Sequence, residues 1–195
     1  MSGDTSQTGK AEIRTTALAA RDALPVADRR RAAQAIAMRR FPVPLGEGTI
    51  VAGYSPIRSE CDPVPLMRSL AGKGAQLALP VIDGKDKPLS FSEWRQGGHL
   101  VAGPFGILQP RTDAVSVDPD IILVPLAAFD RNLRRIGYGA GYYDRTLAAL
   151  RQQRRVVVAV GIAFAAQEVT EIPLDEHDEG LDLVLTEHET IFRSR

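Results

Sequence analysis

The residues best suited to chemistry lie in the segment Arg135–Arg145, which has the sequence RIGYGAGYYDR. Gly137, Gly139 and Gly141 alternate there, so the backbone can adopt positive φ angles and approach a ligand closely. The segment falls between an expected buried strand and an expected helix, where open α/β sheets place their ligands. Backbone amides near a helix N-terminus bind anions. The pattern therefore predicts an anion-binding loop, although by itself it also fits a glycine-rich corner without a ligand.

Charged residues accompany this glycine loop. Arg134, Arg135 and Arg145 flank it, and Asp144 closes it. A carboxylate beside a phosphate-binding loop is best explained by Mg²⁺, which takes one or two carboxylates together with phosphate oxygens and water. The chain contains no GxxxxGK[ST] motif, and the glycine spacing does not match GxGxxG. The charges thus indicate phosphate plus a hard cation, without either common nucleotide-binding signature.

Composition limits the classes of protein that this chain can be. Its 195 residues are 44% hydrophobic and 25% charged, which is typical of a soluble globular domain. The formal net charge of zero argues against binding nucleic acid or an anionic membrane by bulk electrostatics. The single cysteine, Cys61, excludes an internal disulfide framework and a cysteine-based zinc site, and indicates a reducing compartment. No apolar signal segment occurs at the N-terminus, so we expect a cytoplasmic protein.

The charge is balanced in total but unevenly distributed. Residues 10–40 carry eight basic and three acidic groups, a net of +5. Residues 165–195 carry nine acidic and two basic groups, a net of −7. Two solvated faces explain this pattern most simply. The alternative is that the basic N-terminal segment binds an anion and the acidic C-terminal segment tolerates a metal ion.

Apolar periodicity predicts strands alternating with helices. We expect residues 1–9 to form a mobile tail and residues 10–195 a single α/β domain. The alternation implies a parallel or mixed sheet covered by helices on both faces. Helices are predicted over residues 11–24, from an N-cap at Asp28 to Met38, over 64–74 and over 142–154. Strands are predicted over residues 49–56, 76–82, 88–94, 120–130, 155–164 and 181–187.

The segment VPLAAFD…RRIGYGAGYYDR resembles the signature of the 5-formyltetrahydrofolate cyclo-ligase family, also called 5,10-methenyltetrahydrofolate synthetase. The resemblance extends over residues 10–187 and includes YSP…E ending at Glu60, LALPVI, FSEW, PFGILQP and PLDEHDEGLDLVLTE. Two positions depart from the family pattern, which usually has glycine near Leu133 and Gly-Gly in place of Ala140-Gly141. The resemblance implies a three-layer α/β fold with a Rossmann-like sheet.

The resemblance also implies a reaction. Such an enzyme converts 5-formyltetrahydrofolate and ATP to 5,10-methenyltetrahydrofolate, ADP and phosphate, with Mg²⁺ as cofactor. The formyl oxygen attacks the γ-phosphate, nitrogen 10 of the folate closes the ring, and phosphate leaves. This chemistry depends on alignment and charge neutralisation more than on a protein nucleophile. We accordingly expect folate and ATP as small-molecule partners, a monomer, and binding neither to nucleic acid nor to membrane.

Residue roles follow by resemblance. Lys10 and Arg14, four residues apart and hence on one helical face, would hold ATP phosphates. Asp144 and Asp178 would bind Mg²⁺. The remaining ATP contacts would be Arg135, Gly137, Tyr138, Gly139, Ala140, Gly141, Tyr142 and Tyr143. The folate contacts would be Tyr54, Glu60, Trp94, Tyr138, Gly139, Ala140, Gly141 and Tyr142. The catalytic residues would be Arg135, Tyr142 and Asp144.

Without the resemblance, several of these residues have plain structural explanations. Lys10 and Arg14 would be solvated surface cations, and Glu60 an exposed loop carboxylate. Tyr54 and Trp94 are as well explained by core packing. Three other functions stay open: a related nucleotide-binding protein with another substrate, a non-catalytic folate-binding module, and nucleic-acid binding through the arginine-rich second helix.

Overall fold

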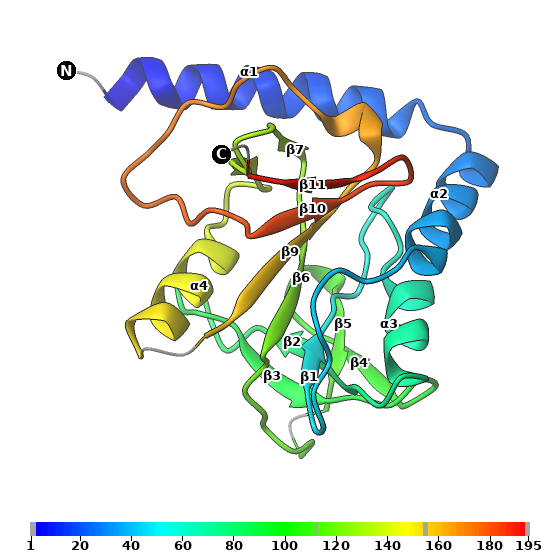
Figure 1. Ribbon diagram of the computed structural model, residues 1–195. Coiled ribbons are helices and arrows are strands. Elements are labelled where there is room, and N and C mark those ends of the chain that lie inside the picture. The colour runs from blue at the N-terminus through cyan, green and yellow to red at the C-terminus, as the bar shows by residue number, and fades with distance from the viewer. Residues whose placement is uncertain (1–2, 112, 154–155, 194–195) are drawn as a thin grey trace.

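The computed structural model describes residues 3–111, 113–153 and 156–193, and a mixed seven-stranded sheet lies at its centre (Figure 1). The five inner strands β10, β9, β6, β1 and β2 are mutually parallel, while β11 and β3 run antiparallel at the two edges. Across the sheet the order is β11 (Thr190–Phe192), β10 (Leu183–Leu185), β9 (Val158–Ile162), β6 (Ile121–Pro125), β1 (Ile50–Ala52), β2 (Gln76–Val81) and β3 (Ser90–Glu93). The expected mixed α/β sheet is confirmed.

The central strand β6 shows why the sheet must be covered on both faces. Ile121, Ile122, Leu123 and Val124 are all almost completely buried. Successive side chains of a strand point to opposite faces, and these four alternate between two separate hydrophobic clusters. A continuous apolar run of this kind is typical of parallel strands covered on both faces.

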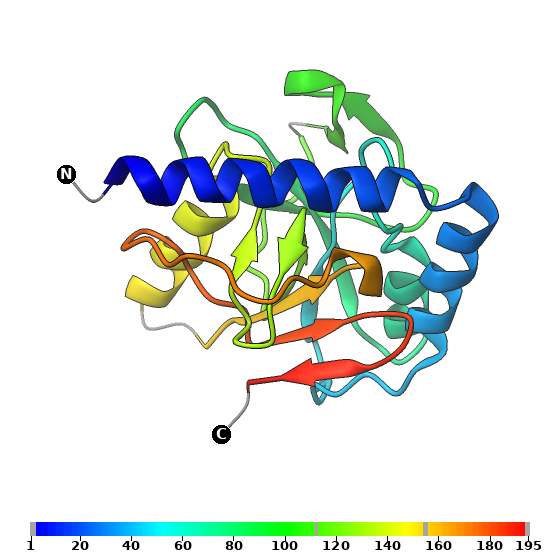
Figure 2. The same ribbon diagram turned by 90° about the horizontal axis from the view of Figure 1, so that it is seen from above.

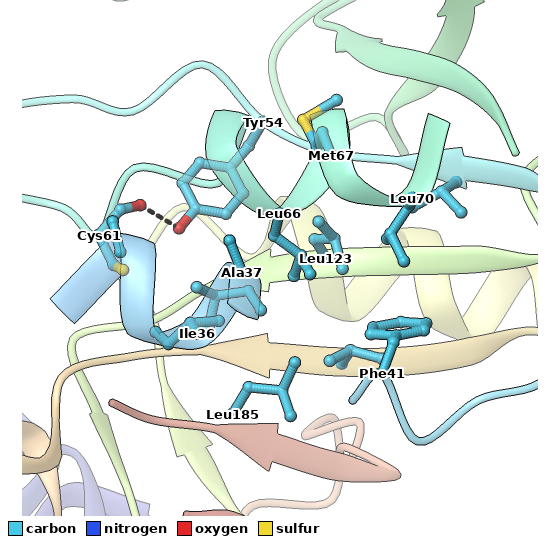
Figure 3. Packing of buried hydrophobic residues seen from close by; sticks show 14 of the residues in the cluster. Ile36, Ala37, Phe41, Tyr54, Cys61, Leu66, Met67, Leu70, Leu123 and Leu185 are labelled. Atoms are coloured by element: carbon cyan, nitrogen blue, oxygen red, sulfur yellow. Dashed lines mark hydrogen bonds between the residues drawn. The ribbon is translucent and has the colours of Figure 1, made fainter. Parts of the chain in front are cut away.

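Helices supply the two covers. The α2 (Val26–Met38) and α3 (Val64–Ala71) helices pack on one face, where Ile36, Leu66 and Leu70 meet the sheet (Figure 3). The α4 helix (Tyr142–Gln152) packs on the other face through Leu147 and Leu150. Together with the sheet they form the three layers that the family resemblance implies.

The α1 helix (Gly3–Asp22) belongs to neither layer. It crosses above the sheet and lies over the hairpin of β7 (Ala128–Phe129) and β8 (Arg135–Ile136), as Figure 2 shows from above. Ala17 is buried there in a small cluster that also contains Ala127 and Ala128. This hairpin directly follows β6, so α1 runs across the carboxyl ends of the parallel strands. We call this side of the sheet its carboxyl edge. None of the helices in the described ranges has both the length and the apolar character needed to cross a membrane.

Several sequence-based boundaries were wrong. Residues 3–9 form the first turns of α1, where we expected a mobile tail. The α2 helix begins at Val26 after Pro25, so Asp28 lies within its first turn and is not its N-cap. The predicted strand 120–130 is divided into β6 and β7. The short strands β4 (Leu100–Ala102), β5 (Leu108–Pro110) and β11 were missed because three residues carry too little periodicity.

The β7–β8 hairpin is held by one buried carboxylate. Asp130 is fully buried, and its Oδ1 accepts hydrogen bonds from the amides of Asn132 and Arg134 at 2.9 and 3.0 Å. Its Oδ2 accepts one from the Ile172 amide at 3.0 Å. The tight turn places Leu133 at φ 64°, the left-handed region, with its side chain buried. This is the position near which the cyclo-ligase family usually has glycine.

We predict an unusual stability order at Leu133. Leu133→Ala removes buried apolar volume and lowers the free energy of unfolding by about 2–5 kcal/mol. Leu133→Gly removes slightly more volume but relieves the left-handed strain, which is worth about 1 kcal/mol. Chemical denaturation is expected to show the glycine variant as the more stable of the two.

Leu147 in α4 provides the matched control, since it is also fully buried but lies within a helix. There the alanine variant must be the more stable, by about 1 kcal/mol. The same order at both positions would contradict the interpretation of Leu133.

Candidate functional site

Three segments far apart in the sequence meet at the carboxyl edge of the sheet: α1, the glycine loop of residues 137–141 and the loop of residues 175–180. Arg14 Nε donates to the carbonyl of Gly137 at 2.7 Å. Lys10 Nζ lies 2.5 Å from Asp178 Oδ2. The two cations of α1 therefore face one side, as their spacing predicts, and each contacts a different loop.

The glycine loop ends in the first turn of α4. Gly139 and Gly141 have φ angles of 95° and 65°, which favour glycine, whereas Ala140 is not among the described residues with positive φ. The alanine that departs from the family pattern thus requires no backbone strain. Gly141 caps α4 without a side-chain hydrogen bond to the first turn, so the amides there have no side-chain acceptor. Free amides at the start of an eleven-residue helix, beside Arg14 and Lys10, suit an anion.

Arg145 braces this loop. Its guanidinium donates to the carbonyl of Ala140 at 2.7 Å and lies over the ring of Tyr142, 5.3 Å from the ring centroid. The next residue, Tyr143, is partly buried, and burial raises the pKa of its hydroxyl above the ordinary value. Arg145 therefore fixes the conformation of the loop and the orientation of Tyr142.

A buried arginine connects the first turn of α4 to the 175–180 loop. The Arg135 side chain is 4% exposed and donates to Asp144 Oδ1 at 2.6 Å. It also donates to the carbonyl of Glu179, whose amide donates to Asp144 Oδ1 at 3.2 Å. Burial lowers the pKa of Arg135, while the negative charges of Asp144 and Asp178 oppose that shift. Arg135 thus holds the Asp144 carboxylate in place.

Asp144 and Asp178, the two carboxylates that the resemblance assigns to Mg²⁺, lie near Arg135. The Asp144 and Asp178 side chains are 33% and 30% exposed, and both carry charges that act on Arg135. No cluster of three or more potential metal ligands occurs within residues 3–111, 113–153 and 156–193. Mg²⁺ commonly takes only one or two carboxylates and completes its shell with phosphate oxygens and water. The pair therefore fits Mg²⁺ that arrives together with a phosphate ligand, and does not fit a metal site built from protein alone.

Glu60 is the carboxylate on the other side of the site. It lies in a tight turn in which its Oε2 accepts a hydrogen bond from the Ile57 amide at 2.8 Å. Burial raises the pKa of Glu60, and the Ile57 amide, the charge of Arg21 and a hydrogen bond with Tyr138 counteract the shift. A partly buried carboxylate next to the glycine loop can accept charge-assisted hydrogen bonds from a ligand. Glu60 is therefore not the exposed loop residue that was the alternative.

The structure places two of the predicted folate contacts, Tyr54 and Trp94, in different surroundings. Tyr54 is 3% exposed in the core, and its hydroxyl donates to the carbonyl of Cys61 at 2.5 Å (Figure 3). The amide of Trp94 donates to the carbonyl of Leu77, near the amino end of β2 and thus at the opposite edge of the sheet. Burial, followed by the charges of Cys61 and Glu60, raises the pKa of the Tyr54 hydroxyl, so Tyr54 lies beside Glu60 and its folate contact stays a prediction. Both side chains pack in the hydrophobic cluster on the α2 and α3 face, and the indole Nε1 of Trp94 is buried there without a hydrogen-bond partner among the described residues.

One residue of the site was not predicted. Arg21 is 1% exposed and contacts Ser59 and Tyr138, which lie 38 and 117 positions away in the sequence. Nothing in the local pattern distinguishes it from the other arginines of residues 10–40. Only the folded arrangement reveals its partners.

Comparison with known proteins gives consistent matches. The family model described as "5-formyltetrahydrofolate cyclo-ligase family" matches residues 6–187. A 5-formyltetrahydrofolate cyclo-ligase of Mycolicibacterium smegmatis is 33% identical over 93% of this chain and 95% of its own length. One from Escherichia coli K12 is 32% identical over 76% of this chain and 83% of its own.

Solved structures match the fold as well. A 5,10-methenyltetrahydrofolate synthetase of Aquifex aeolicus superposes with a TM-score of 0.75 at 30% identity, covering 94% of this chain and 92% of its own. One from Mycoplasma pneumoniae superposes with a TM-score of 0.71 at 24% identity over 91% and 98% of the two chains. The three-layer arrangement is therefore shared with proteins of that name.

The buried thiol beside Glu60 gives a chemical test of the site's packing. Cys61 is 3% exposed, and burial raises the pKa of its thiol. Thiolate is the reactive form, so iodoacetamide at about pH 8 is expected to leave the native protein unmodified and to alkylate the denatured chain fully. Intact-mass spectrometry measures the extent. Equal labelling of both states would contradict the packing around Cys61.

Proposed function

Because the chain belongs to the 5-formyltetrahydrofolate cyclo-ligase family, we propose that it converts 5-formyltetrahydrofolate and ATP to 5,10-methenyltetrahydrofolate, ADP and phosphate. The observation that carries the proposal is the meeting of two α1 cations, a glycine loop and two carboxylates at one edge of the sheet. Composition and net charge agree with a small-molecule enzyme.

In this proposal the phosphates of ATP lie between α1 and the glycine loop. Lys10 and Arg14 neutralise them, and the amides following Gly139 donate hydrogen bonds. In the structure Lys10 contacts Asp178, and Arg14 donates to the carbonyl of Gly137. When a phosphate binds, Lys10 would exchange Asp178, and Arg14 the carbonyl of Gly137, for phosphate oxygens that carry more negative charge.

Asp144 and Asp178 would hold Mg²⁺ in the complex with ATP. When bound, the ion supplies positive charge that stabilises the phosphates during transfer. Arg135 keeps Asp144 oriented through the 2.6 Å contact to Oδ1, so the second carboxylate oxygen of Asp144 remains free of that contact. The catalytic assignment of Arg135, Tyr142 and Asp144 comes from the family resemblance, and this contact supports it for Arg135 and Asp144.

On the folate side, Glu60 would accept hydrogen bonds from pterin nitrogens, and the glycine loop from Tyr138 to Tyr142 would form the wall between the two substrates. The formyl oxygen attacks the γ-phosphorus, the bond to ADP breaks, and an imidate phosphate forms at nitrogen 5. Nitrogen 10 then attacks the formyl carbon and loses its proton, and phosphate leaves with the C–O electron pair. These steps need substrates held in line, which is what the loop and its neighbouring charges provide.

A related enzyme with another substrate is the second candidate. The observation in its favour is the position of Trp94 near the amino end of β2, away from the glycine loop. A cytoplasmic location and a monomeric state remain predictions from the sequence.

The direct test is the ultraviolet absorbance of 5,10-methenyltetrahydrofolate formed by purified protein with 5-formyltetrahydrofolate, ATP and Mg²⁺. We expect an increase that disappears when ATP is omitted or the metal is chelated. A folded protein that binds MgATP without forming product would favour the second candidate.

Asp144→Asn tests the metal role within the same assay. The amide keeps the shape of the side chain but removes the charge, and we expect kcat to fall about 100-fold or more. Asp83→Asn, at an exposed loop position, is the matched control and is expected to retain full activity. Full activity of a folded Asp144→Asn protein would remove Asp144 from the mechanism.

A further inference from the structure

The Arg21 side chain is buried at the last turn of α1, and all three of its guanidinium nitrogens have partners. Nε donates to Ser59 Oγ at 2.9 Å, and Nη1 donates to the hydroxyl of Tyr138. Nη2 lies 3.4 Å from Asp22 Oδ1, which also accepts a hydrogen bond from the hydroxyl of Ser59. The guanidinium carbon is 5.6 Å from the centroid of the Tyr138 ring.

These contacts join three segments. Arg21 belongs to α1, Ser59 and Glu60 to the turn after β1, and Tyr138 to the glycine loop. The Ser59 hydroxyl both receives from Arg21 and donates to Asp22, so its hydrogen-bonding capacity is used within the cluster. The Tyr138 hydroxyl receives from Arg21 and lies close enough to Glu60 for their interaction to lower the pKa of Glu60 and raise that of Tyr138, each against or beside the larger effect of burial. Arg21 thus connects indirectly to the Glu60 carboxylate through the loop tyrosine.

A buried arginine is costly unless charge and geometry are both satisfied. Glu60 supplies opposite charge in the neighbourhood, and the fork of donors matches partners on two separate segments. Lysine carries the same charge on one point donor, so it cannot engage Ser59 and Tyr138 while also stacking on the tyrosine ring. Any cation could compensate the charge of Glu60, but only arginine can make these contacts at the same time.

We propose that Arg21 is a positioning residue of the reaction. It fixes Tyr138 of the glycine loop against the Ser59–Glu60 turn, and so sets where the folate-binding carboxylate stands relative to the loop that receives the nucleotide. The proposal rests on the proposed function and on the role given there to Glu60. It assigns Arg21 no contact with substrate.

The consequence for catalysis is selective. Without Arg21, Tyr138 loses its anchor and the Glu60 turn keeps only the Ser59–Asp22 hydrogen bond to α1. Lys10, Arg14 and their contacts lie elsewhere on the helix. Binding of 5-formyltetrahydrofolate should therefore weaken more than binding of ATP. A purely structural role would affect both substrates alike.

Glu60 gives a second, independent readout. The groups facing it are Arg21 from α1, Arg58 from its own turn, Tyr138 from the glycine loop, and Tyr54 and Tyr143, whose pKa values its charge raises. The neighbouring residues Cys61 and Asp62 lie in the same stretch of chain. Of these groups, Arg21 and Arg58 carry the positive charge that favours ionised Glu60. Removal of the Arg21 charge must therefore raise the pKa of Glu60 and move the acid limb of kcat/KM for the folate to higher pH.

The experiment compares Arg21→Lys, Arg21→Gln and Tyr138→Phe with the parent protein in the absorbance assay. We expect Arg21→Lys and Tyr138→Phe to raise KM for 5-formyltetrahydrofolate about tenfold or more, as the loss of a hydrogen bond to a charged group implies, with a much smaller change in KM for ATP. The double variant Arg21→Lys/Tyr138→Phe should be little worse than Tyr138→Phe, because both act through one contact. Arg21→Gln alone should shift the acid limb to higher pH.

Arg30→Lys is the matched control, since Arg30 is an exposed arginine of α2. It is expected to leave both KM values unchanged. If Arg21→Gln does not fold, the lysine variant and Tyr138→Phe still decide the matter. An active parent enzyme with unaltered KM values in Arg21→Lys, or with equal increases for both substrates, overturns the role of Arg21 alone. A folded parent that forms no product overturns the proposed function instead, and this inference with it.

Discussion

The packing of α1 across the carboxyl edge of the sheet is the constraint on which the candidate site depends. Ala17 is small enough to let the helix approach Ala127 and Ala128 of the β7 segment closely, and that contact fixes the height of the helix above the strands. Lys10 and Arg14 then reach the 175–180 loop and the glycine loop from above, while Arg21 reaches the turn after β1. Displacement of α1 would therefore disturb nucleotide and folate contacts together.

Charge is distributed within the site in opposed pairs. Lys10 faces Asp178 and Arg135 faces Asp144, so the cations and the carboxylates proposed for phosphate and metal neutralise one another in pairs. This limits the cost of holding several charges in a partly buried space. It also suits the proposed ligand MgATP, which brings both charges at once: its phosphates would take the place of Asp178 as partner of Lys10, while Arg135 would keep Asp144 oriented toward the metal.

Local patterns predicted the parts of the site that are local. The alternating glycines place the loop correctly, and the spacing of Lys10 and Arg14 gives one helical face. Sequence could not place Arg21, because its partners lie 38 and 117 residues away and are determined by how α1 crosses the sheet. Sequence could not place Trp94 for the converse reason: an aromatic residue fits a ligand wall or a core equally well until it is known at which end of the strands it lies. Sequence also missed β11, because its three residues carry no strand pattern of their own. It is a strand only through its antiparallel pairing with β10.

The claim that α1, the glycine loop and the 175–180 loop form one nucleotide site is tested most directly by amide hydrogen exchange with and without MgATP. Our account predicts slower exchange in all three segments at once, and little change in the groove between α2 and α3 that Arg40 and Arg68 line. Protection of only one of the three segments, or protection concentrated in that distant groove, would contradict it.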